Sequence, residues 1–214
     1  DNGPVLPERG AAPANGFNNF PTHLDRVQSE IVAKRFRWPL VEKFVRANGI
    51  DRILIGTGAR KLGIVATGKA VQDARQALKL LGLADTDAAA LGISLYQLGC
   101  MYPVEREGLR EFAAGQAELL FIEEKDGLTE AQAKAILYGR PGAPAIVGKT
   151  DETGAFMIPS DEQLDPLQLA LVIAERLRRL GSEPPAIAER ISALRAAMGK
   201  VASQKPGDAV RAPY

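Results

Sequence analysis

The sequence is poor in the side chains that build disulfides, zinc sites and catalytic triads, with one cysteine, one histidine and one tryptophan among 214 residues. Cys100 has no partner for an intramolecular disulfide, and one cysteine with one histidine is too few for a four-ligand zinc site. His23 is the only imidazole available to a Cys–His pair or a Ser–His–Asp triad, and no nucleophile-elbow pentapeptide occurs. We therefore interpret Cys100 as a core or strand-end residue of a cytoplasmic protein.

The sequence also lacks net charge and long apolar runs. Its 27 Lys and Arg residues face 26 Asp and Glu residues, so the formal net charge of +1 gives no basic field for a nucleic acid. No stretch approaches the roughly 20 consecutive apolar residues that span a bilayer. Neither a nucleic acid nor a membrane is therefore an expected partner. Because the chain begins at Asp1 rather than Met, we expect it to be processed or cut from a longer protein.

Composition predicts four segments along the chain. Residues 1–21 are rich in Pro, Gly, Asn and Ala and are predicted to be a linker or wrapping arm. Residues 22–160 alternate apolar runs with helical patterns and are predicted to form an α/β domain. Residues 161–199 are predicted to be a helical hairpin that docks on a neighbouring domain, and residues 200–214 a flexible tail.

Five short apolar runs alternate with amphipathic helices, a pattern that predicts crossover units and a mostly parallel sheet. Several runs are continuously apolar, as strands covered on both faces are. The first run reaches the second through a turn too short for a parallel crossover, so we predict an antiparallel edge strand. The predicted fold is a three-layer α/β/α domain with a C-terminal helical pair. Its predicted strands are residues 53–55, 62–66, 94–98, 119–122 and 145–147.

Helix boundaries are predicted from capping residues. Two N-terminal helices are expected, one opened by Thr22 and one beginning near Pro39 and ended by Asn48 and Gly49. Thr129 and Gln132 have the spacing of a capping box for a later helix. The final pair is predicted to open at Asp165-Pro166 and near Pro185, with the last helix ending at Gly199.

The motif with the most chemical potential is LGIVATGKA at residues 62–70, where a strand ends in Thr67-Gly68-Lys69 and feeds a helix. Open α/β sheets bind ligands outside the carboxyl ends of their strands. Gly68 permits close backbone approach, the helix N-terminus favours an anion and Lys69 adds a positive charge. Another interpretation stays open, in which Gly68 only permits a tight turn and Lys69 is solvated.

Two further segments have simpler interpretations. Gly56-Thr57-Gly58 resembles the start of a phosphate-binding motif but lacks its third glycine, so a hairpin turn explains it better. Glu123 and Glu124 end an apolar strand, where ligands or partner domains approach a sheet, and they are predicted to mark an interface or ligand edge. No paired catalytic constellation is recognisable, so no catalytic or metal-binding residue is predicted.

Taken together, six segments in order resemble indolepyruvate ferredoxin oxidoreductase. The likeness is to the domain of that family that resembles the transketolase C-terminal domain, and it covers roughly residues 36–180. It is carried by RANGIDRI at 46–53, LGIVATGKA at 62–70, DARQAL at 73–78, LGCMYPVEREGLREFA at 98–113, FIEEK at 121–125 and VGK at 147–149.

The resemblance implies a homo-oligomeric 2-oxoacid oxidoreductase that decarboxylates aryl pyruvates on thiamine diphosphate with Mg²⁺. Electrons would pass through [4Fe-4S] clusters to ferredoxin, and the acyl group to coenzyme A. A [4Fe-4S] cluster needs about four thiolates, and this chain has only Cys100, so the cofactors are expected on other domains or subunits. Thr67, Gly68, Lys69, Glu123 and Glu124 match motif positions of the family without an assigned role.

Two functions of different classes remain. In the first, the chain is a noncatalytic middle domain of a thiamine-dependent enzyme that supports subunit assembly and the approach of the acyl acceptor. In the second, it is a freestanding α/β module that binds a nucleotide or coenzyme A at Gly68 and Lys69. The linker-like start and the shortage of cofactor ligands favour the first.

Overall fold

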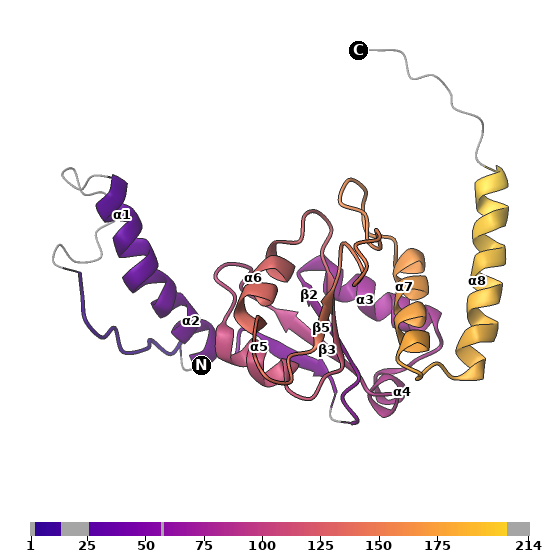
Figure 1. Cartoon of the computed structure of the whole chain (residues 1–214), viewed down its shortest axis with the longest axis horizontal. Helices are drawn as coiled ribbons and strands as arrows, with labels where there is room; N and C mark the ends of the chain where they lie inside the picture. Colours follow the sequence, from indigo (N-terminus) through magenta and orange to yellow (C-terminus); the bar gives the residue numbers. More distant parts are fainter. Residues whose placement is uncertain (1–2, 14–25, 57, 205–214) are drawn as a thin grey trace, which may run out of the picture.

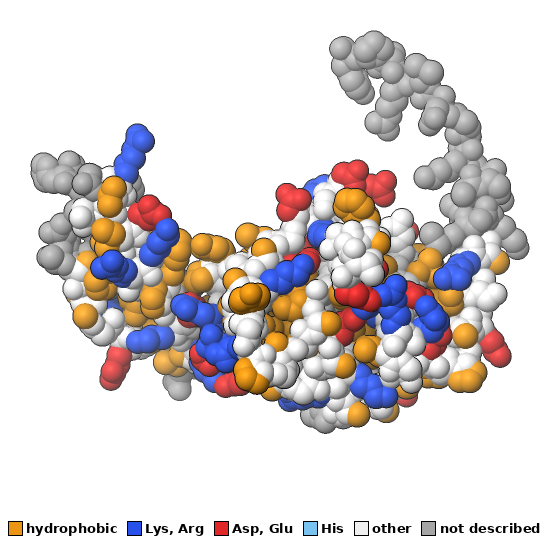
Figure 2. Space-filling view, viewed as in Figure 1, with side chains coloured by type: hydrophobic (Ala, Val, Ile, Leu, Met, Phe, Trp, Pro, Cys, Tyr) orange, Lys and Arg blue, Asp and Glu red, His pale blue; other side chains and the backbone are white. Residues whose placement is uncertain are grey.

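The computed structural model describes residues 3–13, 26–56 and 58–204. Figure 1 shows a central sheet between helices, with one long N-terminal helix projecting from one side and α8 (Pro185–Gln204) standing at the other. The face of the molecule in Figure 2 carries basic and acidic side chains interspersed, with no large area of one sign. In the part of the chain that the structure describes, every helix is too short or too polar to cross a bilayer.

A five-stranded sheet forms the centre of the molecule, in the order β1-β3-β2-β4-β5. β1 pairs antiparallel with β3, and the other neighbours are parallel. The three-layer, mostly parallel α/β/α fold is therefore confirmed, and so is the antiparallel edge. The strands are β1 (Arg52–Ile55), β2 (Leu62–Thr67), β3 (Ile93–Leu98), β4 (Glu118–Ile122) and β5 (Ala145–Val147).

The hairpin predicted at Gly56-Thr57-Gly58 is wrong, because β1 does not pair with β2. Ile53 lies opposite Tyr96 of β3 instead. A Cβ on Gly56, whose φ is +131°, would come within 2.5 Å of Ser94 Oγ, and one on Gly58 within 2.4 Å of the Ala89 carbonyl oxygen. The two glycines are therefore needed where the connection passes close to neighbouring chain; residue 57 lies outside the described residues.

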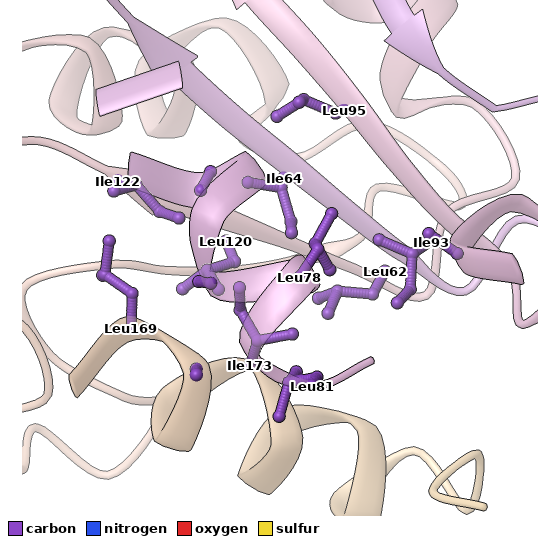
Figure 3. Packing of buried hydrophobic residues seen from close by; sticks show 14 of the residues in the cluster. Leu62, Ile64, Leu78, Leu81, Ile93, Leu95, Leu120, Ile122, Leu169 and Ile173 are labelled. Carbon is purple, nitrogen blue, oxygen red and sulfur yellow. The ribbon is translucent and has the colours of Figure 1, made fainter. Parts of the chain in front are cut away.

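Strand β2 is buried on both faces, and its alternate side chains point into two separate cores. Leu62 and Ile64 face α3 (Lys69–Leu80) and α7 (Pro166–Arg179), as Figure 3 shows. Val65 faces the opposite layer, which consists of α5 (Arg106–Ala113) and α6 (Leu128–Leu137). This alternation explains why the run reads as continuously apolar.

Helix α7 packs against α3, and its side chains Leu169, Ile173 and Leu177 belong to the same core as β2. Its predicted cap is confirmed, since the Asp165 carboxylate accepts the Leu167 N–H at 2.8 Å. Ile187 and Ile191 bring the first turns of α8 onto this core. The division of the chain at residue 160 stays a prediction, while the packing joins α7 to the layer that covers the sheet.

The N-terminal helical region is one continuous helix rather than the two predicted. α1 (Arg26–Val32) runs through a π-helical turn at Ala33–Arg37 into α2 (Trp38–Ala47). The wider turn comes just before Pro39, whose ring would clash with a carbonyl of the preceding turn in an ordinary helix. The helix ends as predicted, with Gly49 at a φ of +55°. Thr22 lies outside the described residues.

Two other helices differ from the prediction. The sequence pattern missed α4 (Asp85–Ala90), which is too short to show a helical period. Helix α8 continues to Gln204, past the predicted end.

Residues 3–13 contain no regular secondary structure, and the Asn48 side-chain amide pairs with the backbone N–H and carbonyl of Val5 at 2.8 and 2.9 Å.

Candidate functional site

The carboxyl ends of β2 and β4 bring all five predicted site residues to one edge of the sheet. A cleft of about 240 Å³ opens there, floored by the two strand ends and walled by the loops that follow them. Its lining residues are Thr67, Lys69, Ala70, Met101, Glu123, Glu124, Lys125 and Asp126. Gly68, between Thr67 and Lys69, is the residue that caps α3.

Gly68 has a backbone conformation that other residues rarely adopt. Its φ of +54° and ψ of −128° turn the chain from β2 into α3, and a Cβ there would meet nothing within 4 Å. Glycine is therefore required by the turn and not by a neighbouring side chain. Lys69 extends into solvent and donates to the Asp73 carboxylate at 2.7 Å, a bond that raises the pKa of the lysine. The positive charge of Lys69 is thus already paired.

Glu123 is buried and caps the helix that follows it. Its two carboxylate oxygens accept the N–H groups of Thr129 at 2.9 Å and Glu130 at 3.1 Å. The predicted capping box of Thr129 and Gln132 is therefore wrong. Gln132 instead accepts the Val104 N–H and donates to the Met101 and Leu128 carbonyls, which ties the loop after β3 to the start of α6.

Two residues that sequence reasoning left without a role complete this polar network. The Lys149 ammonium donates to the backbone carbonyls of Glu123 and of Pro159, the latter at 2.9 Å, and burial lowers its pKa. Buried Glu130 accepts the Lys149 backbone N–H at 3.0 Å and the Lys134 ammonium at 2.6 Å. The sequence signal that was available is the VGK segment at residues 147–149, and the structure shows why it contains glycine: a Cβ on Gly148 would collide with the Glu130 carboxylate.

The donor set of the described residues does not fit the metal centres that the resemblance implies. Cys100 is the only thiol, and its Sγ lies 3.5 Å from the Tyr102 carbonyl. Among the described residues, no three His, Cys, Asp or Glu side chains are grouped so that they could hold a metal ion. A [4Fe-4S] cluster requires several thiolates, and Mg²⁺ at a diphosphate requires carboxylate or carbonyl oxygens around it. No step of cofactor chemistry is therefore assigned to these residues.

A family comparison matches residues 52–200, more than half of the chain, to the model described as the indolepyruvate oxidoreductase domain. One curated relative is the indolepyruvate oxidoreductase subunit IorA of Methanothermobacter marburgensis. It is 27% identical over 194 residues, which cover 87% of this chain and 30% of that protein. The chain thus spans about a third of the length of the relative that it matches.

Two solved structures show more distant likenesses. One is a split-gene transketolase described as an inactive β4 tetramer, with a TM-score of 0.42 and 19% identity over 63% of this chain and 42% of that one. The other is the 2-oxoglutarate:ferredoxin oxidoreductase of Magnetococcus marinus with 2-oxoglutarate, coenzyme A and succinyl-CoA bound. It has a TM-score of 0.48 and 12% identity over 72% of this chain and 24% of that one. At these scores neither likeness adds to what the strand order shows.

Proposed function

This chain belongs to the indolepyruvate oxidoreductase domain family, and from that premise we propose that it is a noncatalytic domain of a larger oxidoreductase. The parent enzyme would be a thiamine diphosphate-dependent 2-oxoacid:ferredoxin oxidoreductase that acts on aryl pyruvates and transfers the acyl group to coenzyme A. The observation that carries the noncatalytic role is the use of the buried polar groups at the sheet edge. The Glu123 carboxylate accepts two N–H groups at the start of α6. The Glu130 carboxylate accepts the Lys149 backbone N–H and the Lys134 ammonium. The Lys149 ammonium donates to the backbone carbonyls of Glu123 and Pro159.

The same edge has the features of a docking surface for other parts of that enzyme. Met101, Tyr102 and Leu128 are large apolar side chains that are each between 43% and 51% exposed. Gln132 joins two of them, since it donates to the carbonyls of both Met101 and Leu128. Apolar side chains gathered on an exposed edge are typical of contacts between domains or subunits. We therefore propose that this edge supports assembly and lies beside the approach of the acyl acceptor.

In this proposal thiamine diphosphate, Mg²⁺ and the [4Fe-4S] clusters are bound outside this chain, and the single cysteine of the chain supports that placement for the clusters. Ferredoxin and coenzyme A are partners of the whole enzyme in this proposal, and the homo-oligomer and the cytoplasmic location stay predictions. The relative matched by this chain is about three times as long, which leaves ample protein for these sites.

Substitution of Leu128 tests the docking surface. Leu128→Glu in the parent enzyme should weaken its assembly at least about tenfold, because a charge would be buried without a partner in an apolar contact. The fold should survive, since an acidic residue in the first turn of α6 suits the helix N-terminus. Assembly is measured by sedimentation velocity over a dilution series.

The matched control is Tyr138→Glu, at the other end of α6, where the side chain is 90% exposed. It should leave the assembly state as in the wild type. If the Leu128→Glu enzyme dissociated over the same concentration range as the wild-type enzyme, that result would contradict the proposed surface.

The charges of the cleft argue against the alternative nucleotide or coenzyme A module at Gly68 and Lys69. Three carboxylates line it, from Glu123, Glu124 and Asp126, against the two ammonium groups of Lys69 and Lys125. Lys69 is also held by Asp73. With Glu123 held by the N–H groups of α6, the two remaining carboxylates balance the two ammonium groups, so a polyanion would meet no excess of positive charge.

Thermal unfolding of this 214-residue chain separates the two functions. We expect coenzyme A, ATP and thiamine diphosphate with Mg²⁺ to leave its melting temperature unchanged at millimolar concentrations. A ligand present at 100 times its Kd would add about 2.7 kcal/mol, or roughly 5–10 °C for a chain of this size. A rise of that order with ATP would support the alternative binding module and contradict the expectation that this chain binds no nucleotide by itself.

A further inference from the structure

The N-terminal helix extends well beyond the domain to which it is attached. Its residues 26–47 span roughly 33 Å at about 1.5 Å per residue, and Figure 1 shows its first half standing clear of the sheet. α1 makes no extensive contact with the sheet or with the helices that cover it. Its Val27 side chain is 63% exposed. Because helices in proteins draw most of their stability from packing, this segment needs a partner surface.

The helix is strongly basic, although the chain as a whole is nearly neutral. Residues 26–47 contain six Lys and Arg residues and two Glu residues, which gives the helix a net charge of +4 against +1 for the whole chain. Arg26, Arg35 and Lys43 are exposed, and none of them forms an ion pair with another described residue. A surface that receives this helix should therefore be acidic.

An acidic rim of this kind follows the carboxyl ends of β4 and β5. Its carboxylates, none of which forms an ion pair within the described part of the chain, are Glu124, Asp126, Asp161 and Glu162. The first two line the cleft at the end of β4, with Lys125 between them. The other two follow Pro159, whose carbonyl accepts the same Lys149 ammonium as the carbonyl of Glu123. The rim thus has an excess of negative charge.

The docking surface proposed above lies between the helix and this rim. Tyr102 meets the helix at Trp38, with the two rings edge to face and their centroids 5.2 Å apart, and Met101 lines the cleft beside the acidic rim. Figure 2 shows the molecule hollowed next to the N-terminal helix, with hydrophobic side chains on the floor of the hollow. An apolar floor beside an acidic rim complements a basic helix with exposed apolar side chains.

The helix cannot fill the hollow of its own chain, because its second half is fixed to the domain. Val45 is buried, and the Glu42 carboxylate accepts two N–H groups of the Arg106 guanidinium, at 2.6 and 2.9 Å. Since the basic helix and the acidic rim belong to one chain, the surface is self-complementary, as the interface of a two-fold dimer must be.

We propose that the hollow receives the N-terminal helix of a second copy of this chain, with the cations of the helix at the acidic rim and Val27 over the apolar floor. Each copy in such a dimer donates one helix and receives one. The inference rests on the docking surface of the proposed function and names the partner that covers it.

Mixing two charge-reversed variants tests this pairing. The helix variant carries Arg26→Glu with Arg35→Glu, and the rim variant carries Asp161→Lys with Glu162→Lys; all four side chains are exposed and unpaired, so both variants should fold. In sedimentation velocity the wild-type chain should dimerise, and each variant alone should dimerise at least about tenfold more weakly, because the substituted residues repel the other surface. An equimolar mixture should recover most of the wild-type affinity, since each helix again meets a rim of opposite charge.

The control is Lys79→Glu with Arg140→Glu, which changes the net charge as the helix variant does. Both residues are exposed and lie at the ends of α3 and α6 that are remote from the cleft. This variant should dimerise as the wild type does.

Three results would overturn the proposal: a wild-type chain that stays monomeric up to about 100 µM, a mixture that associates no better than its components, or a control as weak as the helix variant. If the mixture fails while Leu128→Glu still dissociates the parent enzyme, another part of that enzyme covers the docking surface. The second copy is then the wrong partner, and the proposed function stands.

Discussion

Replacing Arg176 with alanine should lower the free energy of unfolding by about 3–5 kcal/mol, because it leaves a buried carboxylate without its cation. Arg176 is 3% exposed and Glu118 is 3% exposed. The guanidinium forms a two-point contact with Glu118, in which Nε donates to Oε1 at 2.7 Å and Nη2 donates to Oε2. Nη2 also donates to Glu152 at 2.9 Å. One side chain of α7 thus fixes the start of β4 and the loop after β5.

Urea unfolding at neutral pH measures this loss, and two further variants interpret it. Arg178→Ala breaks the pair with Glu175, whose members are 61% and 39% exposed, and should cost less than about 1 kcal/mol. The double variant Glu118→Leu with Arg176→Met removes both buried charges and should recover most of the lost stability. A single Arg176→Ala variant as stable as Arg178→Ala would show that Glu118 finds another partner or water.

The sheet could be predicted from sequence because its signal is local. The inner strands β2 and β4 are short, mainly apolar runs buried along almost their whole length, so the run itself marks the strand whatever its neighbours are. The partner of β1 could not be read in this way. The short connection between residues 55 and 62 excludes a parallel crossover, but the choice of β3 over β2 depends on contacts such as Gly56 against Ser94.

The polar contacts that hold the candidate site were harder to predict, because they join residues distant in the chain. Arg176 and Glu118 are 58 residues apart, and Lys149 and Glu123 are 26 apart. At α6 a local pattern was misleading. Thr129 and Gln132 have capping-box spacing, but the helix begins before Thr129, at Leu128. A carboxylate from the preceding strand end accepts the N–H groups of Thr129 and Glu130 in its first turn. A glutamate that ends a buried strand just before a helix is the signal that was available.

Replacing Glu123 with alanine should destabilise the chain by about 2–3 kcal/mol, since the buried N–H groups of Thr129 and Glu130 would lose their acceptors. Glu123→Gln should cost about half as much, because the amide keeps one acceptor oxygen for two N–H groups. The partly exposed neighbour Glu124 gives the control, and Glu124→Ala should stay within about 0.5 kcal/mol of the wild type. Urea unfolding of the three variants gives these differences.

The Gln variant also distinguishes a structural carboxylate from a catalytic one. If Glu123 acts only as a helix cap, the parent enzyme carrying Glu123→Gln should keep its kcat with an aryl pyruvate once the enzyme is assembled and folded. On heating, the Glu123→Gln enzyme should lose activity at the temperature at which it unfolds. The less stable Glu123→Ala enzyme should likewise lose activity at its own, lower unfolding temperature. Loss of kcat at a temperature where Glu123→Gln is fully folded would instead assign the carboxylate to the chemistry, and the noncatalytic role of this domain would be wrong.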